Sequence, residues 1–567
     1  MADVGAGLQA IEDLDRQRNA HHQDIDAQPA RRQSIGYGQT GEGDYSLFSC
    51  IPGFSERKSK FKAYAKSTQL RRRLTSSCYV LLTLAYVAYL LVALHVDTDV
   101  DEADYWCEGD GFLLFVTGFL AILVVYFLGM KPLVRWVIYL IVTVAISFYL
   151  YVDTSNDRRR LQSLVGLFLF ILLGFVFSVA PKKVIWRQVI WGLALQFILG
   201  VIVLRWPVGR KLFECTGRKL SQILLFTQNG SNHVFGPLGT KFAVFAFKIL
   251  PTVIFFSFCV KILYYIGIMQ WIVIKLGWLM QATIGTTPCE SVIAAASIFL
   301  SMSEAPLLIR PFIHLMTMSE LHAVMTGGFA TIAGSVMAAY ISFGVSASHL
   351  LSASVMSAPA ALAYSKLFYP ETEVSKTSAQ EIPVVRSDET NVLHAAVEGV
   401  VAALPLVANI AANLITFIAF IAFFNAIFDW SCVLVGADAG VCTLQNVFGY
   451  IFMPLAWSMG VPWDECHAVG TLLGLKTIVN EFVAYSAMSE MIKDDQLSTR
   501  SQVIATYALC GFSNLASMGI QLGVIGALAP ERRTHVASIV FRAMIAGSAA
   551  CFMTACIAGV LLGDESS

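Results

Sequence analysis

Apolar stretches of membrane-spanning length recur along most of the sequence, and they constrain the fold more than any other feature. A helix needs about 20 predominantly apolar residues to cross the hydrocarbon core of a bilayer. The 567 residues are 56% hydrophobic and only 14% charged, a composition typical of a protein with many membrane spans. The sequence therefore predicts an all-α polytopic membrane protein.

Matching the apolar stretches to the required length predicts about 11 transmembrane helices. The matching segments are 77–96, 111–129, 136–152, 161–180, 188–206, 241–270, 320–345, 347–368, 393–428, 501–528 and 535–561. Two further apolar blocks, 272–312 and 447–490, are interrupted by Gly, Pro and Glu. Because broken backbone is tolerated at membrane depth only inside protein or beside a water-filled cavity, we expect both blocks to be re-entrant hairpins.

The polar amino-terminal region and the charged loops predict the orientation. Residues 1–75 are largely polar, and we expect a disordered cytosolic tail. A basic cluster at 56–73 precedes the first span and favours a cytosolic amino terminus. An odd number of spans then places the carboxyl terminus outside the cell. Residues 207–236 alternate apolar and basic side chains, which predicts an amphipathic helix lying in the membrane interface.

Charge and cysteine usage exclude some function classes. The 39 basic and 39 acidic residues balance, so no electrostatic argument for binding nucleic acid exists. The 12 cysteines form neither a CxxC pair nor a metal-ligand spacing. Cys432 and Cys442 flank a short polar stretch that the topology places outside, and they are the best disulfide candidates.

Residues 301–336 introduce charged and hydroxylated side chains into an otherwise apolar region, among them Glu304, Arg310 and Glu320. A carboxylate at bilayer depth is costly, and it usually faces a partner, a cavity or a substrate. The block therefore indicates either a transporter site built from interrupted helices or an intramembrane enzyme that uses carboxylates as acid and base. A gated channel is a third class.

The order of motifs in this region recurs later in the chain. A Gly-Thr pair, a carboxylate and a Gly-Phe motif appear as Gly285-Thr286, Glu304 and GFATIAGS (328–335), and again as Gly470-Thr471, Glu481 and GFSNLASM (511–518). Interrupted segments at corresponding places in two halves point to a transporter binding site at the repeat interface. The alternative is two unrelated motifs of small residues that pack helices together.

The polar residues of the two blocks suit a small polyhydroxylated ligand, because they combine carboxylates with amides and hydroxyls. Those that could contact it are Ser303, Glu304, Asn480, Glu481, Phe512, Asn514 and Ser517. Structural ion pairs with Arg310 or Lys476 are the alternative for the two carboxylates. An enzyme would need a nucleophile or metal beside them, and no His, Asp and Cys constellation supplies one.

These stretches resemble the concentrative nucleoside transporter family, through GTTPCES, SEAPLLIRP, SELHAVMTGGFATIAGS, NEFVAY and CGFSNLASMGI, over about residues 160–562. The resemblance implies a secondary active symporter, not an enzyme, that imports nucleosides across the plasma membrane. The sodium gradient would drive import, with Na+ co-transported and no cofactor. It also implies a homotrimer, in which each protomer holds a fixed scaffold and an inverted-repeat transport domain that moves as an elevator.

The resemblance also divides the chain into regions. They are the tail at 1–75, three additional helices at 76–155, scaffold helices with the interfacial helix at 156–270, the first hairpin and first broken helix at 271–346, scaffold helices at 347–446, the second hairpin and second broken helix at 447–530, and the last helix with a short extracellular tail at 531–567.

Carried over residue by residue, the resemblance assigns nucleoside binding to a set of eight positions: Met302, Ser303, Glu304, Val336, Glu481, Phe512, Asn514 and Ser517. It assigns selectivity to Ser301, Met302, Ser335 and Val336. Met302 replaces a Gln that is common in the family and would hydrogen-bond the base. The two selectivity pairs mix residues of purine- and pyrimidine-preferring members, which favours purine-tolerant or broad selectivity.

The family's sodium site falls on Ser297, Leu300, Thr331 and Ile332. Sodium is a hard cation, and carbonyl and hydroxyl oxygens are the ligands it prefers. Members often have Asn at the position of Ser297, whose hydroxyl has a shorter reach, so proton coupling remains an alternative. The partners implied are nucleosides, sodium and the lipid bilayer, with no nucleic acid.

Overall fold

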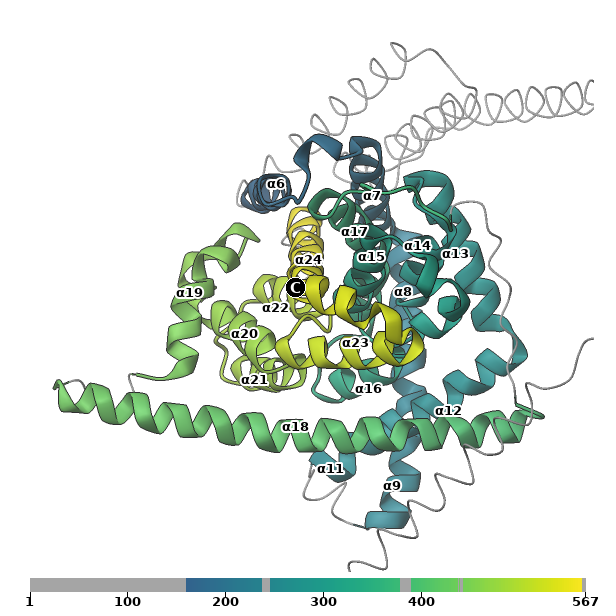
Figure 1. Cartoon of the computed structure of the whole chain (residues 1–567). Coiled ribbons are helices and arrows are strands. Elements are labelled where there is room, and N and C mark those ends of the chain that lie inside the picture. The colour runs from purple at the N-terminus through teal and green to yellow at the C-terminus, as the bar shows by residue number, and fades with distance from the viewer. Residues whose placement is uncertain (1–159, 237–244, 378–388, 437, 439–441, 563–567) are drawn as a thin grey trace, which may run out of the picture. The chain divides into compact units, whose positions relative to one another are not determined.

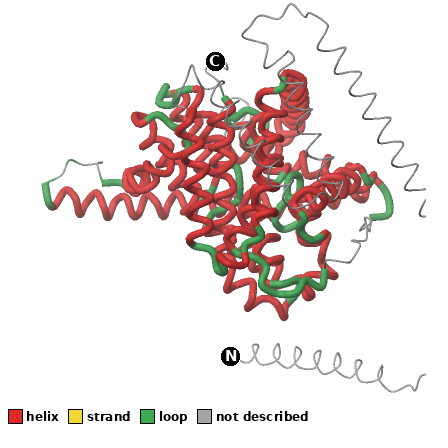
Figure 2. Tube along the Cα trace, turned by 90° about the horizontal axis from the view of Figure 1, so that it is seen from above, coloured by secondary structure: helices red, strands yellow, loops and turns green. Residues whose placement is uncertain are grey.

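The computed structural model describes residues 160–236, 245–377, 389–436, 438 and 442–562. Within these ranges the regular structure is helical and no strand occurs (Figure 2). The all-α class is therefore confirmed for the described part of the chain. The tail at 1–75 and the expected spans at 77–96, 111–129 and 136–152 lie outside the described residues.

The described chain begins with two helices and an amphipathic segment. The elements are α6 (Arg160–Val176), η1 (Pro181–Lys183), α7 (Trp186–Gly200), η2 (Val201–Arg205), α8 (Pro207–Leu225) and α9 (Thr227–Phe235). α7 and η2 together are long and apolar enough to cross a membrane. On α8, Leu212 and Leu225 are exposed, as an interfacial helix requires, because their apolar side chains would then contact lipid.

Two later stretches of the chain share one order of elements. The first contains α11 (Phe245–Lys248), α12 (Leu250–Ile266), α13 (Ile268–Ile284), α14 (Pro288–Ala296), η3 (Ala305–Leu315), α15 (Met318–Ala330) and α16 (Gly334–Ser342). The second contains α18 (Val392–Leu434), α19 (Leu444–Ser458), η4 (Trp463–Glu465), α20 (Cys466–Ile478), α21 (Glu481–Lys493), α22 (Thr499–Leu509) and α23 (Leu515–Leu528). In both, a helix that packs on its counterpart (α12 on α18) precedes a second helix, a pair of helical segments and a helix broken in two.

Two helices outside the repeats, α17 (Ala347–Phe368) and α24 (Arg533–Leu561, preceded by η5, Pro530–Arg532), form the centre of the described core. Both pack on α15, and α24 also packs on α22 (Figure 1). Small residues let these helices approach closely: a Cβ on Gly547 would lie only 2.5 Å from the Cβ of Phe329. The expected span 347–368 coincides with α17.

α18 is longer than a simple membrane span. Its 43 residues correspond to about 64 Å of helix, roughly twice the thickness of the hydrocarbon core. Figure 1 shows it as one long, uninterrupted helix, and side chains such as Ile415, Phe423 and Trp430 are exposed. Near its end, Cys432 is bonded to Cys442, which confirms the predicted disulfide.

Among the described residues, three helices are long and apolar enough to cross a membrane, at 186–205, 392–434 and 530–561. α12 and α13 would add a fourth span as a bent pair, because they meet at 76°. Within the span expected at 241–270, α12 ends at Gly267, which has φ +91°, a conformation that favours glycine. The count of about 11 spans stays a prediction.

Candidate functional site

Two helices are interrupted within the repeated Gly-Phe motifs. α15 ends at Ala330 and α16 begins at Gly334, while α22 ends at Leu509 and α23 begins at Leu515. The segments expected as spans at 320–345 and 501–528 are therefore each divided into two helices, as the broken helices implied by the family resemblance require. The second break is fixed locally by Asn514, whose Oδ1 accepts a hydrogen bond from Ser517 N at 2.8 Å and caps α23.

The two breaks contact each other. The backbone N–H of Phe512 donates to the carbonyl of Thr331 at 3.3 Å. Gly511 has φ +144°, and a Cβ there would lie 2.7 Å from the carbonyl oxygen of Phe329, so only glycine fits. Segments about 180 residues apart in sequence thus leave their helical hydrogen bonding at one common point.

The Gly-Thr pairs that suggested the repeat are not structurally equivalent. Gly285 ends α13 in the left-handed conformation, and Thr287 caps α14 two residues later. Gly470 and Thr471 instead lie within α20. The blocks predicted as hairpins also each contain an additional helix, α13 or α19, before the two hairpin segments. Periodicity could not separate these helices, because all of them are apolar.

The second hairpin places Glu481 at the start of α21, with Asn480 as its cap. The Glu481 side chain is buried, with 2% exposure. Its Oε1 accepts a hydrogen bond from the Tyr340 hydroxyl at 3.1 Å, and its Oε2 accepts one from Asn514 Nδ2 at 2.7 Å. The carboxylate thereby joins the hairpin to both broken helices. Lys476, the ion-pair partner considered as an alternative, donates instead to the carbonyl of Ala508 at 2.9 Å.

The first hairpin holds Glu304 in the turn between α14 and η3. Its Oε2 accepts hydrogen bonds from the backbone N–H and the hydroxyl of Ser301, at 3.1 and 3.0 Å. The hydroxyls of Ser301 and Ser303 are 2.8 Å apart. Arg310 is exposed, and no ion pair between it and Glu304 occurs among the described side chains. Glu304 is only partly buried, so its carboxylate is accessible at the turn.

The apolar residues assigned to the site are all buried. Met302, Val336 and Phe512 are 4%, 1% and 8% exposed and belong to the cluster that also contains Tyr340. Ser517 is buried one turn along α23 from the break. Ser335 lies in the first turn of α16. Hydrogen bonds thus form two separate groups among the predicted site residues that the structure describes: Glu481 with Asn514 and Tyr340, and Ser301 with Ser303 and Glu304.

The residues assigned to sodium lie on two segments that are hydrogen-bonded to each other through Gly334 N and the carbonyl of Phe299, at 3.0 Å. The Ser297 side chain is 1% exposed, and its hydroxyl has no hydrogen-bond partner among the described residues. Thr331 Oγ1 donates to the carbonyl of Gly327 at 2.9 Å. Oxygen donors of this kind fit a hard cation. No group of three His, Cys, Asp or Glu in the described chain suits a transition metal.

Sequence reasoning missed a buried ion pair between Lys366 of α17 and Glu290 of α14. Lys366 also donates to the Ser319 hydroxyl at 3.0 Å. Glu320, singled out in the sequence, belongs to this neighbourhood: its Oε2 accepts from Thr317 N at 2.8 Å in a capping box, and its Oε1 accepts from Thr377 at 2.6 Å. The sequence signal for this role of Glu320 was the spacing Thr317-x-x-Glu320, which predicts the start of a helix rather than a contact with a ligand.

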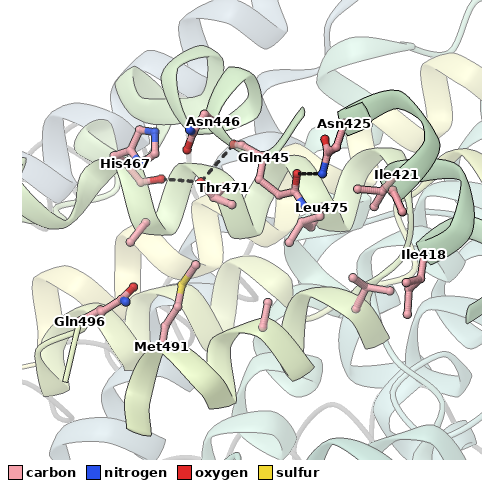
Figure 3. A pocket seen from close by; sticks show the side chains of 14 residues that line it. Ile418, Ile421, Asn425, Gln445, Asn446, His467, Thr471, Leu475, Met491 and Gln496 are labelled. Carbon is pink, nitrogen blue, oxygen red and sulfur yellow. Dashed lines mark hydrogen bonds between the residues drawn. The ribbon is translucent and has the colours of Figure 1, made fainter. Parts of the chain in front are cut away.

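A cavity of about 560 Å³ lies between α18 and the second hairpin (Figure 3). Val483, Ala487 and Met491 line it from α21, whereas Glu481 is absent from its lining. On its other side Asn425 Nδ2 donates to Gln445 Oε1 at 2.8 Å. The hairpin therefore separates this cavity from the cluster around Glu481, and none of the predicted site residues lines it.

Three known protein families match most of the described chain. A family described as "Na+ dependent nucleoside transporter C-terminus" matches residues 349–559, and its N-terminus counterpart matches residues 165–238. A family described as "Nucleoside recognition" matches residues 246–347.

Curated relatives cover the same region. Solute carrier family 28 member 3 of Eptatretus stoutii is 48% identical over 76% of this chain and 65% of its own length. The Homo sapiens protein of that name is 47% identical over 75% and 64%, and sodium/nucleoside cotransporter 1 of Mus musculus is 44% identical over 73% and 66%. The chain thus spans less than two thirds of the length of these relatives. Their names describe transporters rather than enzymes.

Solved structures match the fold. CNTnw in an inward-facing substrate-bound state is 38% identical with a TM-score of 0.68, covering 72% of this chain and 99% of CNTnw. A CNTnw variant in an outward-facing state is 39% identical with a TM-score of 0.68, covering 71% and 98%. Other CNTnw structures are described as intermediate states.

Proposed function

The chain belongs to the Na+ dependent nucleoside transporter family, and on this premise we propose that it is a secondary active symporter that imports nucleosides with sodium. The observation that carries the proposal is the buried Glu481 carboxylate, held by Tyr340 of one broken helix and Asn514 of the other. Each carboxylate oxygen has acceptor capacity beyond the single bond it makes to protein. Hydroxyls of a ribose are donors of the kind that this capacity would bind.

The proposed nucleoside site extends from Glu481 to the first hairpin. Asn514 and Ser517 lie on the buried face of α23, and Glu304 and Ser303 offer further oxygens at the hairpin turn. Met302, Val336 and Phe512 supply an apolar wall on which a planar base can pack. The thioether of Met302 is a weak acceptor and no donor. Base recognition at this residue is therefore permissive, which agrees with purine-tolerant or broad selectivity at Ser301, Met302, Ser335 and Val336.

Sodium is the proposed coupling ion, bound by Ser297, Leu300, Thr331 and Ile332. The unpartnered Ser297 hydroxyl and the non-helical backbone at both segments supply oxygens without any titratable side chain. A proton would need a titratable ligand at this point, and the four residues offer none. The name of the relative sodium/nucleoside cotransporter 1 also specifies sodium.

The mode of transport follows from the paired repeats and from the several states in which CNTnw has been solved. In the proposed mechanism the two hairpins and two broken helices form a transport domain that moves as an elevator against the α12 and α18 scaffold. The proposed assembly is a homotrimer in the plasma membrane, with the amino terminus in the cytosol and the carboxyl terminus outside.

The test is uptake of labelled uridine and guanosine into cells that lack endogenous nucleoside transport. We expect accumulation of both nucleosides in sodium medium and background uptake in choline medium. Uptake driven by a proton gradient in the absence of sodium would identify the proton, rather than sodium, as the coupling ion. Equilibration without accumulation would indicate a channel, and chemical conversion of the nucleoside at the membrane would indicate an enzyme.

A further inference from the structure

Gln521 is a buried polar residue on the same face of α23 as the proposed nucleoside ligands. The buried side chains of this helix form one stripe at a spacing of four residues: Ser517, Gln521 and Ile525. Asn514 caps the helix directly before them. Gln521 therefore lies one helical turn, about 6 Å, beyond Ser517 and points into the same part of the protein.

The Gln521 amide has no hydrogen-bond partner within the described chain. Its side chain is 1% exposed, and both Nε2 and Oε1 are unpaired. Leaving one buried donor or acceptor unsatisfied costs about 1–3 kcal/mol, so most buried amides are paired. An amide with both atoms unpaired has a donor and an acceptor available to a partner from outside the protein.

The surroundings of Gln521 place its amide beside the first hairpin. A Cβ built on Gly328 would lie 2.4 Å from Gln521 Nε2 and 2.9 Å from the Cβ of Met302. The absence of a side chain at Gly328 is therefore what lets the amide approach α15 and Met302. Gln521 thus extends from the second broken helix to the residue that forms the apolar end of the proposed site.

We infer that Gln521 recognises the base of the nucleoside, an inference that rests on the proposed nucleoside binding. Met302 offers no hydrogen-bond donor, so Gln521 supplies the polar contact at this end of the site. A primary amide presents a donor and an acceptor side by side, and it pairs with a base edge that presents the complementary couple, as adenine does. Rotating the amide exchanges donor and acceptor, so one residue serves purines and pyrimidines.

The experiment compares Gln521→Met with the unchanged protein, both as the purified full chain. The variant keeps the side-chain length and removes both amide atoms. Binding is measured for uridine, adenosine and difluorotoluene riboside, which has the shape of uridine but a base without strong hydrogen-bonding groups. We expect roughly tenfold weaker binding of uridine and adenosine and unchanged binding of difluorotoluene riboside. Ile525→Met, one turn further along the stripe, is the matched control and should leave all three affinities unchanged.

Two further measurements exclude a structural role. The ligand-free unfolding temperature of Gln521→Met should not fall, because the substitution removes unpaired buried atoms. The double variant Gln521→Met/Met302→Gln places an amide at position 302, which also lies beside Gly328. It should recover binding of uridine relative to difluorotoluene riboside.

The inference is overturned if the three affinities fall equally, if Gln521→Met unfolds more easily or fails to fold, or if only the half-saturating sodium concentration changes. Unchanged uridine binding by Gln521→Met, with normal binding by the unchanged protein, overturns this inference alone. If the unchanged protein binds none of the three ligands, the proposed function itself fails.

Discussion

Replacing Glu481 with Gln perturbs the proposed site at its centre while keeping the side-chain volume. Asn514 Nδ2 can only donate, so the remaining oxygen of the new amide must face it. The new amide nitrogen then faces Tyr340, whose hydroxyl can rotate to accept. Both protein contacts survive, and we therefore expect the variant to fold and reach the membrane normally.

The substitution instead weakens the binding of the nucleoside. Before the change, each oxygen of the Glu481 carboxylate has acceptor capacity left for a ribose hydroxyl. Afterwards one of the two positions is a donor, and the other is an uncharged acceptor. Losing one charge-assisted hydrogen bond costs about 1.5–3 kcal/mol, and weakening the second costs about 1 kcal/mol more. The sum corresponds to roughly a hundredfold weaker nucleoside binding.

The assay is equilibrium binding of uridine to the purified variant, together with uptake normalised to surface expression. Tyr340→Phe is the matched control, because it removes one hydrogen bond from Glu481 and leaves the charge in place. We expect less than tenfold weaker binding for this control. Uridine affinity within threefold of the unchanged protein in Glu481→Gln would refute the assignment of the carboxylate to the ribose.

Three further substitutions test other parts of the account. Met302→Gln adds a donor to the apolar end of the site and should shift the ratio of uridine to guanosine uptake towards uridine; an unchanged ratio would remove Met302 from base selection. Ser297→Ala deletes an unpaired buried hydroxyl and should raise the half-saturating sodium concentration roughly tenfold at unchanged expression, whereas an unchanged sodium dependence would exclude Ser297 as a ligand. Lys366→Met leaves Glu290 as an uncompensated buried charge and should destabilise the fold by about 3–5 kcal/mol in thermal unfolding; adding Glu290→Gln should restore most of this loss, and no restoration would contradict the pairing.

Structural features that depend on a few neighbouring residues could be predicted from the sequence. α24 was predictable from an apolar stretch of the right length, and the disulfide from two cysteines around a short polar segment. Asn480 and Asn514 precede helices, and asparagine is among the preferred residues at that position. The candidate site was therefore recognisable as two hairpin turns and two Gly-Phe motifs.

Contacts between segments far apart in the sequence could not be predicted from it. The hydrogen bond of Tyr340 to Glu481 joins residues 141 positions apart, and nothing in the local pattern of either segment distinguishes it from ordinary packing. The unpaired amide of Gln521 becomes visible only when α23 is placed against Gly328. The division of the hairpin blocks into three helical segments depends on glycines with positive φ at positions 285 and 460, and the apolar periodicity of the sequence does not reveal such turns.

The central claim is that a sodium gradient drives nucleosides through the site where the two helix breaks meet. The most direct measurement is accumulation of labelled uridine in proteoliposomes that contain only this purified chain, with sodium outside and choline inside. We expect an internal uridine concentration above the external one, and we expect a sodium ionophore to abolish this difference. Equal concentrations on both sides, or accumulation that persists after the sodium gradient is dissipated, would contradict the central claim.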